Sequence, residues 1–368
     1  MDRKEPEKKI WIPERLQEVT GKGRKEKSVF LITCRELKEQ AREEILQRSS
    51  DNNLLTGEAI LDEQSLTYGA VSSASEHTAQ FEELLLYLCR NWVDEVYVAL
   101  KNPDRIPDEI LEQIVDMGIQ VRIRNSGRRN LKTGKEKIET EGNLKICSIC
   151  LVPQTAVGAF FKRAFDISAA LVGCVFAALI IVILAPFIWV QSPGPILFRQ
   201  TRVGKNGKLF DFYKIRTMYP DAEKRKAELM KQNEMEGPIF KLTYDPRIIG
   251  TKKLPDGTVK HGIGNFIREY SLDEFPQFFN VLKGDMSIVG TRPPTLDEWN
   301  QYKPHHRARL AMKPGITGLW QVSGRNDIRN FEEVVKLDRK YMKEWSPLLD
   351  LKIFFKTISV VLKKTGAL

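Results

Sequence analysis

One long uncharged stretch dominates the hydrophobic pattern of the chain. Residues 167–198 contain no Asp, Glu, Lys or Arg, and residues 167–190 are apolar at almost every position. As an α-helix, residues 167–190 would extend about 36 Å, whereas the hydrocarbon core of a bilayer is about 30 Å thick. The pattern therefore predicts a membrane helix over 159–191. A buried core helix is the alternative, and the length of the run argues against it.

Cations flank this stretch on both sides. Cytoplasmic flanks carry the excess of Lys and Arg, so neither end of the stretch is marked as external. Pro186 lies within the run, where it removes a backbone donor and kinks a helix. We therefore expect a re-entrant helix that breaks at Ala185 and Pro186 and returns to its own side; a spanning helix is the alternative. The flanking cations are Lys162, Arg163, Arg199 and Arg202.

The chain before this stretch alternates between strand-like and helix-like segments, which predicts a parallel, Rossmann-like sheet over 28–126. The dinucleotide-binding fingerprint follows a strand, but Gly21 and Gly23 precede the first one. This domain therefore has no identified ligand. We expect a charged tail over 1–27 and a linker and strand over 127–158. The predicted strands are 28–33, 55–61, 94–100 and 119–123, and the predicted helices are 36–48, 80–92 and 107–117.

Residues 192–368 predict a second domain, mainly helical with some strands, so the whole chain is α/β with an α+β C-terminal domain. Apolar runs at 196–203 and 209–215 flank a Gly-containing turn and predict a hairpin. Residues 348–362 combine apolar residues with lysines, which is typical of a helix lying in the membrane interface. Packing of this helix against its own domain is the alternative.

The chain is basic, with 58 Lys and Arg against 48 Asp and Glu and a net charge of +10. Nucleic acid, an anionic membrane and phosphorylated substrates all suit such a charge. Nucleic acid is not expected, because the chain has no interleaved aromatic and basic motif and no zinc finger. The first 27 residues lack the apolar core of a secretory signal, so reduced thiols facing the cytoplasm are expected.

The segment around Asp273 carries the chemistry that the sequence suggests. Ser271 and Glu274 have the spacing of a capping box, which is the structural alternative to a catalytic role for Glu274. Asp273 would then lie in the first helical turn, where backbone N–H groups and the helix dipole keep a carboxylate ionised. Such a carboxylate can attack phosphorus or bind a hard cation such as Mg²⁺.

Five motifs occur in an order that resembles the bacterial sugar transferases, the monotopic polyprenyl-phosphate phosphoglycosyl transferases. The resemblance covers about residues 158 to 368. The motifs are KRAFD at 162–166, FDFYKIRTM at 210–218, SLDE at 271–274, LKGDMSIVGTRP at 282–293 and KPGITGLWQVSGR at 313–325.

The resemblance implies transfer of a sugar 1-phosphate from a UDP-sugar to undecaprenyl phosphate, with release of UMP, as the first membrane step of exopolysaccharide, capsule or O-antigen assembly. It implies that Asp273 attacks phosphorus, forms a covalent phospho-sugar intermediate and holds Mg²⁺. Glu274 would either assist deprotonation of the acceptor or orient Asp273. It also implies a re-entrant helix broken at Pro186, although Ala185 stands where many relatives have Ser.

The family pattern implies further substrate and phosphate contacts, for which the alternative is a solvated surface role. We expect the enzyme at the inner membrane with its catalytic domain in the cytoplasm, and the extra N-terminal domain suggests a homodimer. A non-catalytic, membrane-anchored regulator that senses a nucleotide is the competing function. The implied contact residues are Arg268, Lys214, Arg216, Arg292, Arg325 and Gln321.

Overall fold

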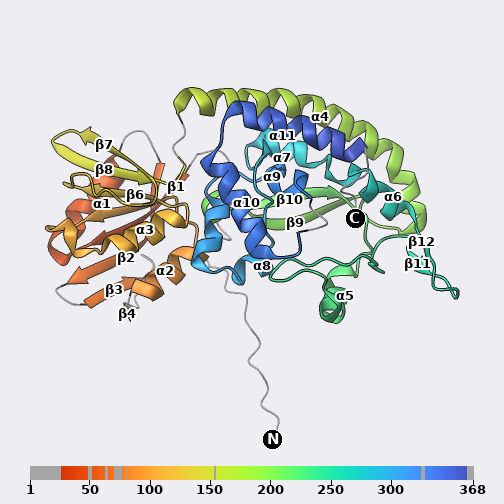
Figure 1. Ribbon diagram of the computed structural model, residues 1–368, viewed down its shortest axis with the longest axis horizontal. Helices are drawn as coiled ribbons and strands as arrows, with labels where there is room; N and C mark the ends of the chain where they lie inside the picture. The colour runs from red at the N-terminus through yellow and green to blue at the C-terminus, as the bar shows by residue number, and fades with distance from the viewer. Residues whose placement is uncertain are drawn as a thin grey trace, which may run out of the picture.

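The computed structural model consists of a sheet domain and a helix-rich domain that lies beneath one long helix, α4 (Figure 1). The predicted charged tail lies almost wholly outside the described residues. The structure describes residues 26–48, 52–62, 65–69, 77–79, 81–152, 155–324 and 328–362.

The N-terminal domain is built on one eight-stranded sheet with the order β4-β3-β2-β1-β5-β6-β8-β7. The four central strands β2, β1, β5 and β6 pair in parallel, and the outer pairs are antiparallel. The predicted parallel core is therefore present, but the sheet as a whole is mixed. The strands are β1 (Glu26–Thr33), β2 (Asn52–Asp62), β3 (Ser65–Gly69), β4 (His77–Ala79), β5 (Glu95–Ala99), β6 (Gln120–Arg124), β7 (Lys135–Glu141) and β8 (Leu144–Cys150).

Part of the predicted linker is a strand. Residues 135–141 form β7, which pairs along its whole length with β8. Polar and charged residues occupy most of β7 and leave it half-exposed or exposed, as is common for a strand at the edge of a sheet. Its sequence therefore resembles a linker, because the hydrophobic alternation of a half-buried strand is missing.

The helices α1 (Lys38–Gln47), α2 (Phe81–Arg90) and α3 (Asp108–Asp116) connect the parallel strands. Pro107 is the N-cap of α3. The helices α2 and α3 contact η7 (Pro304–Leu310) of the C-terminal domain. The fully buried Arg307 in η7 donates to the carbonyls of Val93 and Met117 at 3.0 and 3.1 Å, which joins the two domains.

The long helix α4 (Ala156–Gln191) runs through Ala185 and Pro186 without interruption. The predicted break at these two residues is therefore wrong, because the helix continues through both of them. Pro186 still removes one backbone donor, so the carbonyl of Val182 loses its intrahelical partner. Figure 1 shows α4 as a continuous arch over the C-terminal domain, with α11 (Pro347–Leu362) beside it.

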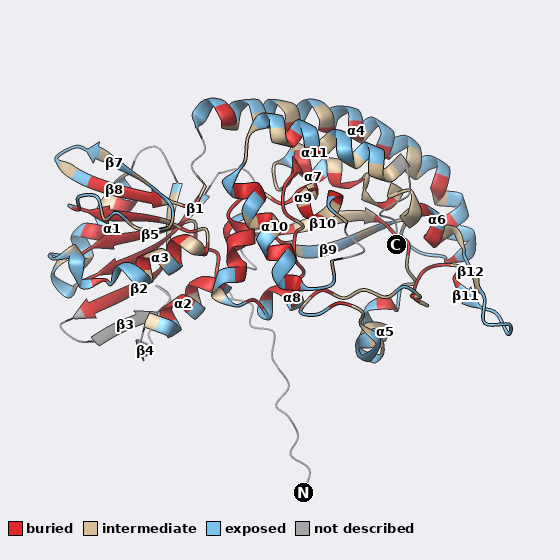
Figure 2. Ribbon diagram, viewed as in Figure 1, coloured by how far each residue is buried: buried red, intermediate tan, exposed pale blue. Residues whose placement is uncertain are grey.

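A narrow stripe of α4 packs on the C-terminal domain, and the rest of its apolar surface faces outward (Figure 2). Gly173 lies so close to α7 that a Cβ atom there would be 2.3 Å from Phe278 Cγ. Within its most apolar window, only 22% of the helix is buried. An apolar surface of this extent indicates membrane association. The buried stripe comprises Ala170, Gly173, Ala177, Leu184 and Ile188.

Polar contacts fix both ends of α4 to the same domain. At the N-terminal end, Lys162 forms an ion pair with Asp350 at 2.7 Å, and the buried Asp166 accepts from Ser287 Oγ at 2.8 Å. At the C-terminal end, Ser192 Oγ accepts from Arg216 at 2.9 Å. The helix therefore lies along its domain instead of projecting from it.

The C-terminal domain contains the predicted hairpin, in which β9 (Leu197–Val203) and β10 (Leu209–Ile215) pair antiparallel. The predicted final helix, α11, contacts α4, α9 and β13, yet Leu348, Phe355 and Ile358 on it are exposed. The packing of this helix against its own domain is therefore confirmed, and its position in the membrane interface stays a prediction. The other elements are α5 (Ala222–Leu229), β11 (Lys252–Lys253), β12 (Val259–Lys260), α6 (Ile263–Glu269), η6 (Leu272–Glu274), α7 (Gln277–Lys283), β13 (Ser287–Val289), α8 (Leu296–Asn300), β14 (Gly315–Thr317), α9 (Leu319–Val322) and α10 (Phe331–Lys343).

The close packing at Gly173 leads to a stability prediction. Gly173→Leu should lower the unfolding free energy by about 1–3 kcal/mol or more, because the new side chain overlaps Phe278 and forces α4 off α7. Chemical denaturation in detergent measures this change. The control is Val175→Leu on the outward face, where Val175 is 63% exposed and the added methylene meets no protein atom. Equal stability of the two variants would contradict the packing described here.

Candidate functional site

The two acidic residues of the SLDE motif lie in the short helix η6, and the predicted capping box does not form. Ser271 adopts a left-handed conformation with φ of 53° and makes no capping hydrogen bond. The longer helix α7 begins only at Gln277, after Pro276. Asp273 is nevertheless in the first turn of a helix, as predicted, and is 6% exposed.

Lys214 joins these carboxylates to strand β10. Its Nζ lies 2.9 Å from Asp273 Oδ2 and 3.2 Å from Glu274 Oε1. The fully buried Asn280 of α7 sets this geometry, because its side-chain amide accepts from Tyr213 N and donates to the carbonyl of Asp211 on β10. These bonds hold α7 and the preceding η6 in register with the strand that carries Lys214.

Lys214 and Glu274 line a cavity of about 230 Å³, which we call the polar cavity. Six cations and two carboxylates line it, an excess of four positive charges. Such an excess in a partly enclosed space attracts a multiply charged anion. The cations are Arg202, Lys214, Lys241, Arg247, Arg268 and Arg292, and the carboxylates are Asp245 and Glu274.

Some of these cations are paired within the protein. Arg247 binds Asp245 through two hydrogen bonds of 2.8 and 2.7 Å. Burial would raise the pKa of Asp245, but the hydrogen bonds and charge of Arg247 outweigh this effect and lower it. Arg292 binds Glu298 through bonds of 2.9 and 3.1 Å. These pairs fix the guanidinium groups at the cavity wall.

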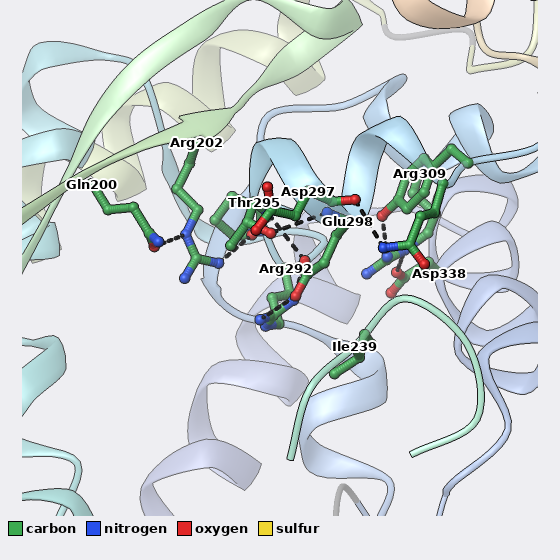
Figure 3. Close-up of polar contacts among 12 residues, drawn as sticks. Gln200, Arg202, Ile239, Arg292, Thr295, Asp297, Glu298, Arg309 and Asp338 are labelled. Atoms are coloured by element: carbon green, nitrogen blue, oxygen red, sulfur yellow. Dashed lines mark hydrogen bonds and ion pairs between the residues drawn. The ribbon is translucent and has the colours of Figure 1, made fainter. Parts of the chain in front are cut away.

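Arg202 has a different environment (Figure 3). It donates to Pro293 O at 2.8 Å and to Gln200 Oε1 at 2.9 Å, and it forms no ion pair with any carboxylate that the structure describes. Burial, and then the charge of Arg292, lower the pKa of Arg202 to about 10. An anion in the polar cavity would offset this unfavourable environment, so Arg202 is a strong candidate for phosphate binding.

Two buried donors in the cavity wall have no hydrogen-bond partner within the described part of the chain. They are Gln277 Nε2 and Trp320 Nε1, on side chains whose residues are 2% and 3% exposed. Leaving a buried donor unpaired costs about 1–3 kcal/mol, so a ligand with acceptor oxygens would relieve this cost.

The structure brings most of the expected site residues together. Lys214, Arg268, Glu274, Arg292 and Gln321 line the polar cavity. Asp273 is not among the lining residues and lies beside it, bound to Lys214.

Two expected phosphate-binding arginines are not in this group. The guanidinium of Arg216 binds the hydroxyl and the carbonyl of Ser192, so this residue anchors the end of α4 and does not reach the cavity. Arg216 is not among the residues that line the polar cavity, and its role in phosphate binding stays a prediction. Arg325 lies outside the described residues.

Sequence reasoning missed other lining residues. Arg202 was interpreted only as a flank of the membrane helix, and Lys241 and Arg247 lie in a segment with no recognised motif. Gln277 and Trp320 could have been found, because Gln277 follows SLDE by three residues and Trp320 lies inside the KPGITGLWQVSGR motif.

The donor set suits Mg²⁺. Asp273 and Glu274 already share one cation, the ammonium of Lys214, so their carboxylates converge on a single position. Carboxylate oxygens are ligands that Mg²⁺ prefers, together with substrate phosphates. The residues therefore fit the expected metal.

A second cluster, formed by His305, His306 and Glu332, fits a metal less well. His306 is buried, and its Nε2 lies 2.8 Å from Glu332 Oε1. Its Nδ1 accepts from the backbone N–H of Lys303 at 3.1 Å, so the neutral ring carries its proton on Nε2. That nitrogen donates to Glu332 and is not available as a ligand.

Comparison with known proteins gives one family match. The family described as bacterial sugar transferase matches residues 157–364. The galactosyl transferase CpsE of Streptococcus agalactiae is 44% identical over 70% of this chain and 55% of its own length. The undecaprenyl-phosphate galactose phosphotransferase of Salmonella typhimurium is 41% identical over 56% of this chain and 42% of its own.

A shorter relative is matched along most of its length. The exopolysaccharide production protein ExoY of Rhizobium meliloti is 34% identical over 57% of this chain and 89% of its own length. The chain spans about half the length of the first two relatives. The family match covers α4 and the C-terminal domain, whereas the match to CpsE extends over 259 residues of this chain.

The charge of the polar cavity predicts that it binds pyrophosphate. At ten times its Kd, pyrophosphate should stabilise the protein by about 1.4 kcal/mol, which a rise in melting temperature detects. Arg268→Met should weaken binding at least about tenfold, because a desolvated guanidinium–phosphate contact is lost. Arg128→Met, at an exposed arginine of the sheet domain, should leave the shift unchanged. An equal loss in both variants would mean that the shift comes from surface charge.

Proposed function

This chain belongs to the bacterial sugar transferase family, and we propose that it transfers a sugar 1-phosphate from a UDP-sugar to undecaprenyl phosphate. The observation that carries this proposal is the position of Lys214, which links Asp273 and Glu274 at the wall of a strongly cationic cavity. The names of relatives support the acceptor and the product class, since they include undecaprenyl-phosphate phosphotransferases and exopolysaccharide proteins.

The donor binds in the polar cavity. Its diphosphate is held by the excess of cations there, with Arg202, Arg268 and Arg292 as the main contacts. Gln277 Nε2 and Trp320 Nε1 donate to oxygens of the uridine or the sugar, which gives both buried groups a partner. This part of the site is built from segments on both sides of the motif that carries Asp273.

In the first step, Asp273 attacks the β-phosphorus of the donor. A bond forms between a carboxylate oxygen of Asp273 and phosphorus, and the bond from phosphorus to the UMP oxygen breaks, so UMP leaves with the electron pair. Lys214 Nζ, which neutralises Asp273 before the donor binds, moves to the phosphate oxygens and frees the nucleophile. Bound Mg²⁺, held by Asp273 and the diphosphate, would offset the charge of the leaving group.

In the second step, a phosphate oxygen of the acceptor attacks the same phosphorus. The bond from phosphorus to Asp273 breaks, the carboxylate is regenerated, and the product is a polyprenyl diphosphate sugar. Glu274 takes the proton from an acceptor that arrives as the monoanion. This assignment relies on its position, because Glu274 lines the cavity while Asp273 lies beside it.

The enzyme acts at the cytoplasmic face of the inner membrane. Both ends of α4 are held by one charged domain, through Lys162 at one end and Ser192 at the other. A helix that crossed the bilayer would draw this domain into the hydrocarbon core, at a large desolvation cost. We therefore propose that α4 lies embedded in one leaflet along its outward apolar face, and that UDP-sugars reach the site from the cytoplasm.

The two-step mechanism predicts different defects for the two carboxylates. Asp273→Asn should lower turnover at least about 1,000-fold and should abolish the phospho-sugar adduct that mass spectrometry detects without acceptor. Glu274→Gln should still form the adduct and release one equivalent of UMP, but it should transfer the sugar phosphate slowly. Adduct formation by Asp273→Asn, or UMP release that always requires the acceptor, would contradict the mechanism. Unchanged membrane association of both variants serves as the control.

The membrane arrangement predicts that both flanks of α4 face the cytoplasm. Single cysteines placed before Lys162 and after Arg202, in a background without the native thiols, should both resist a membrane-impermeant maleimide in intact cells. Both should react after the membrane is permeabilised. Labelling of only one position in intact cells would mean that the helix spans the bilayer.

A further inference from the structure

A second cavity lies next to the polar cavity and is lined mainly by apolar side chains. It has a volume of about 290 Å³ and is enclosed by η6, α7, α9 and α11. We call it the apolar groove. Its apolar lining includes Phe275, Phe278, Ile316, Phe354, Ile358 and Val361.

The apolar groove and the polar cavity meet at the catalytic residues. Glu274, Ile316 and Gln321 line both spaces. Lys214 and Arg268 lie on the polar side of this junction, and the final turns of α11 lie on the apolar side. A molecule that occupied both spaces would therefore have an anionic group at one end and a hydrocarbon chain at the other.

The apolar groove also reaches the outward apolar surface. Ile358 lines it and is 42% exposed, and Phe355 on the same helix is 63% exposed. Phe354, another lining residue, packs against Phe165 of α4 with ring centroids 5.5 Å apart. Figure 1 shows α11 alongside α4, so the groove opens near the helix that we place in the leaflet.

We propose that the apolar groove holds the first isoprene units of the polyprenyl phosphate acceptor, with its phosphate at the junction beside Glu274 and Lys214. This inference rests on the proposed function, and it assigns the acceptor chain a site within the protein instead of leaving it in the surrounding lipid. The charge of the polar cavity favours a polyprenyl phosphate, because the phosphate monoester at the end of the chain would contact the cations of the cavity. A UDP-sugar has no apolar part to occupy the groove.

The arrangement explains why the chemistry is specific for a lipid phosphate. Isoprene units in the groove exclude water and orient the phosphate toward the intermediate on Asp273. Part of the acceptor's binding energy then comes from the chain and part from its charge. Shortening the chain should weaken binding until the groove is no longer filled, and lengthening it beyond the groove should have little further effect.

The test compares two substitutions on α11. Val361→Phe places a larger side chain in the apolar groove, whereas Ser359→Phe adds the same ring at an exposed position that does not line it. Val361→Phe should raise the KM for undecaprenyl phosphate at least about tenfold, the scale of a few displaced methylenes, with the KM for the UDP-sugar and the melting temperature unchanged. Ser359→Phe should behave as wild type. Equal acceptor KM values for Val361→Phe and wild type would overturn the proposal.

A binding measurement tests the groove without turnover. A farnesyl phosphate that carries a benzophenone on its chain should crosslink to the tryptic peptide 357–363, and excess undecaprenyl phosphate should compete. Val361→Phe should reduce this labelling and Ser359→Phe should not. Crosslinking without any sugar transfer would overturn the proposed activity and support the groove. Labelling elsewhere, or equal competition by phosphatidylglycerol, would overturn the groove, because its occupant would then be an ordinary membrane lipid.

Discussion

The ammonium of Lys214 determines the state of the active site, because it neutralises two adjacent carboxylates beside an otherwise cationic cavity. Asp273 is almost fully buried, and a buried carboxylate without a partner is costly. The ion pair with Lys214 offsets this cost in the absence of substrate. In the mechanism proposed above, the donor's diphosphate then competes for the ammonium and exposes Asp273 when phosphorus is within reach. One interaction would therefore both stabilise the folded protein and control the proposed nucleophile.

The position of this ion pair depends on how α7 is held between two other elements. On one side Asn280 fastens α7 to β10, and on the other Phe278 packs over Gly173 of α4. Asp273 and Glu274, the proposed catalytic carboxylates, are consequently at a fixed distance from the helix whose outward face is apolar. This arrangement places the polar cavity close to the apolar surface of α4.

The sequence predicts those features of the structure that depend on residues close together in the chain. The central parallel strands, the β9–β10 hairpin and the long apolar helix follow from hydrophobic periodicity, and the motifs drew attention to Asp273, Glu274 and Lys214. Hydrophobic periodicity did not predict the local conformations at Pro186 and Ser271, or which distant residues line the cavity, because these features depend on the tertiary structure. Pro186 favours a break in a helix, yet α4 continues through it. Ser271 has the spacing of a cap but a left-handed backbone. Arg247 and Lys241 reach the cavity from a segment that no local pattern marks.

The buried Arg307 provides several of the polar contacts between the N-terminal domain and the C-terminal domain. Arg307 is fully buried, its pKa is lowered by burial to about 10, and its partners are backbone carbonyls from both domains, including Asn206 O at 3.0 Å. Asn206 lies in the turn between β9 and β10, the strand that carries Lys214. Because directional bonds to carbonyls tolerate little displacement, a shift of α2 or α3 relative to η7 would be transmitted to this turn. The sheet domain is thus joined to the hairpin that carries Lys214 by hydrogen bonds as well as by apolar packing.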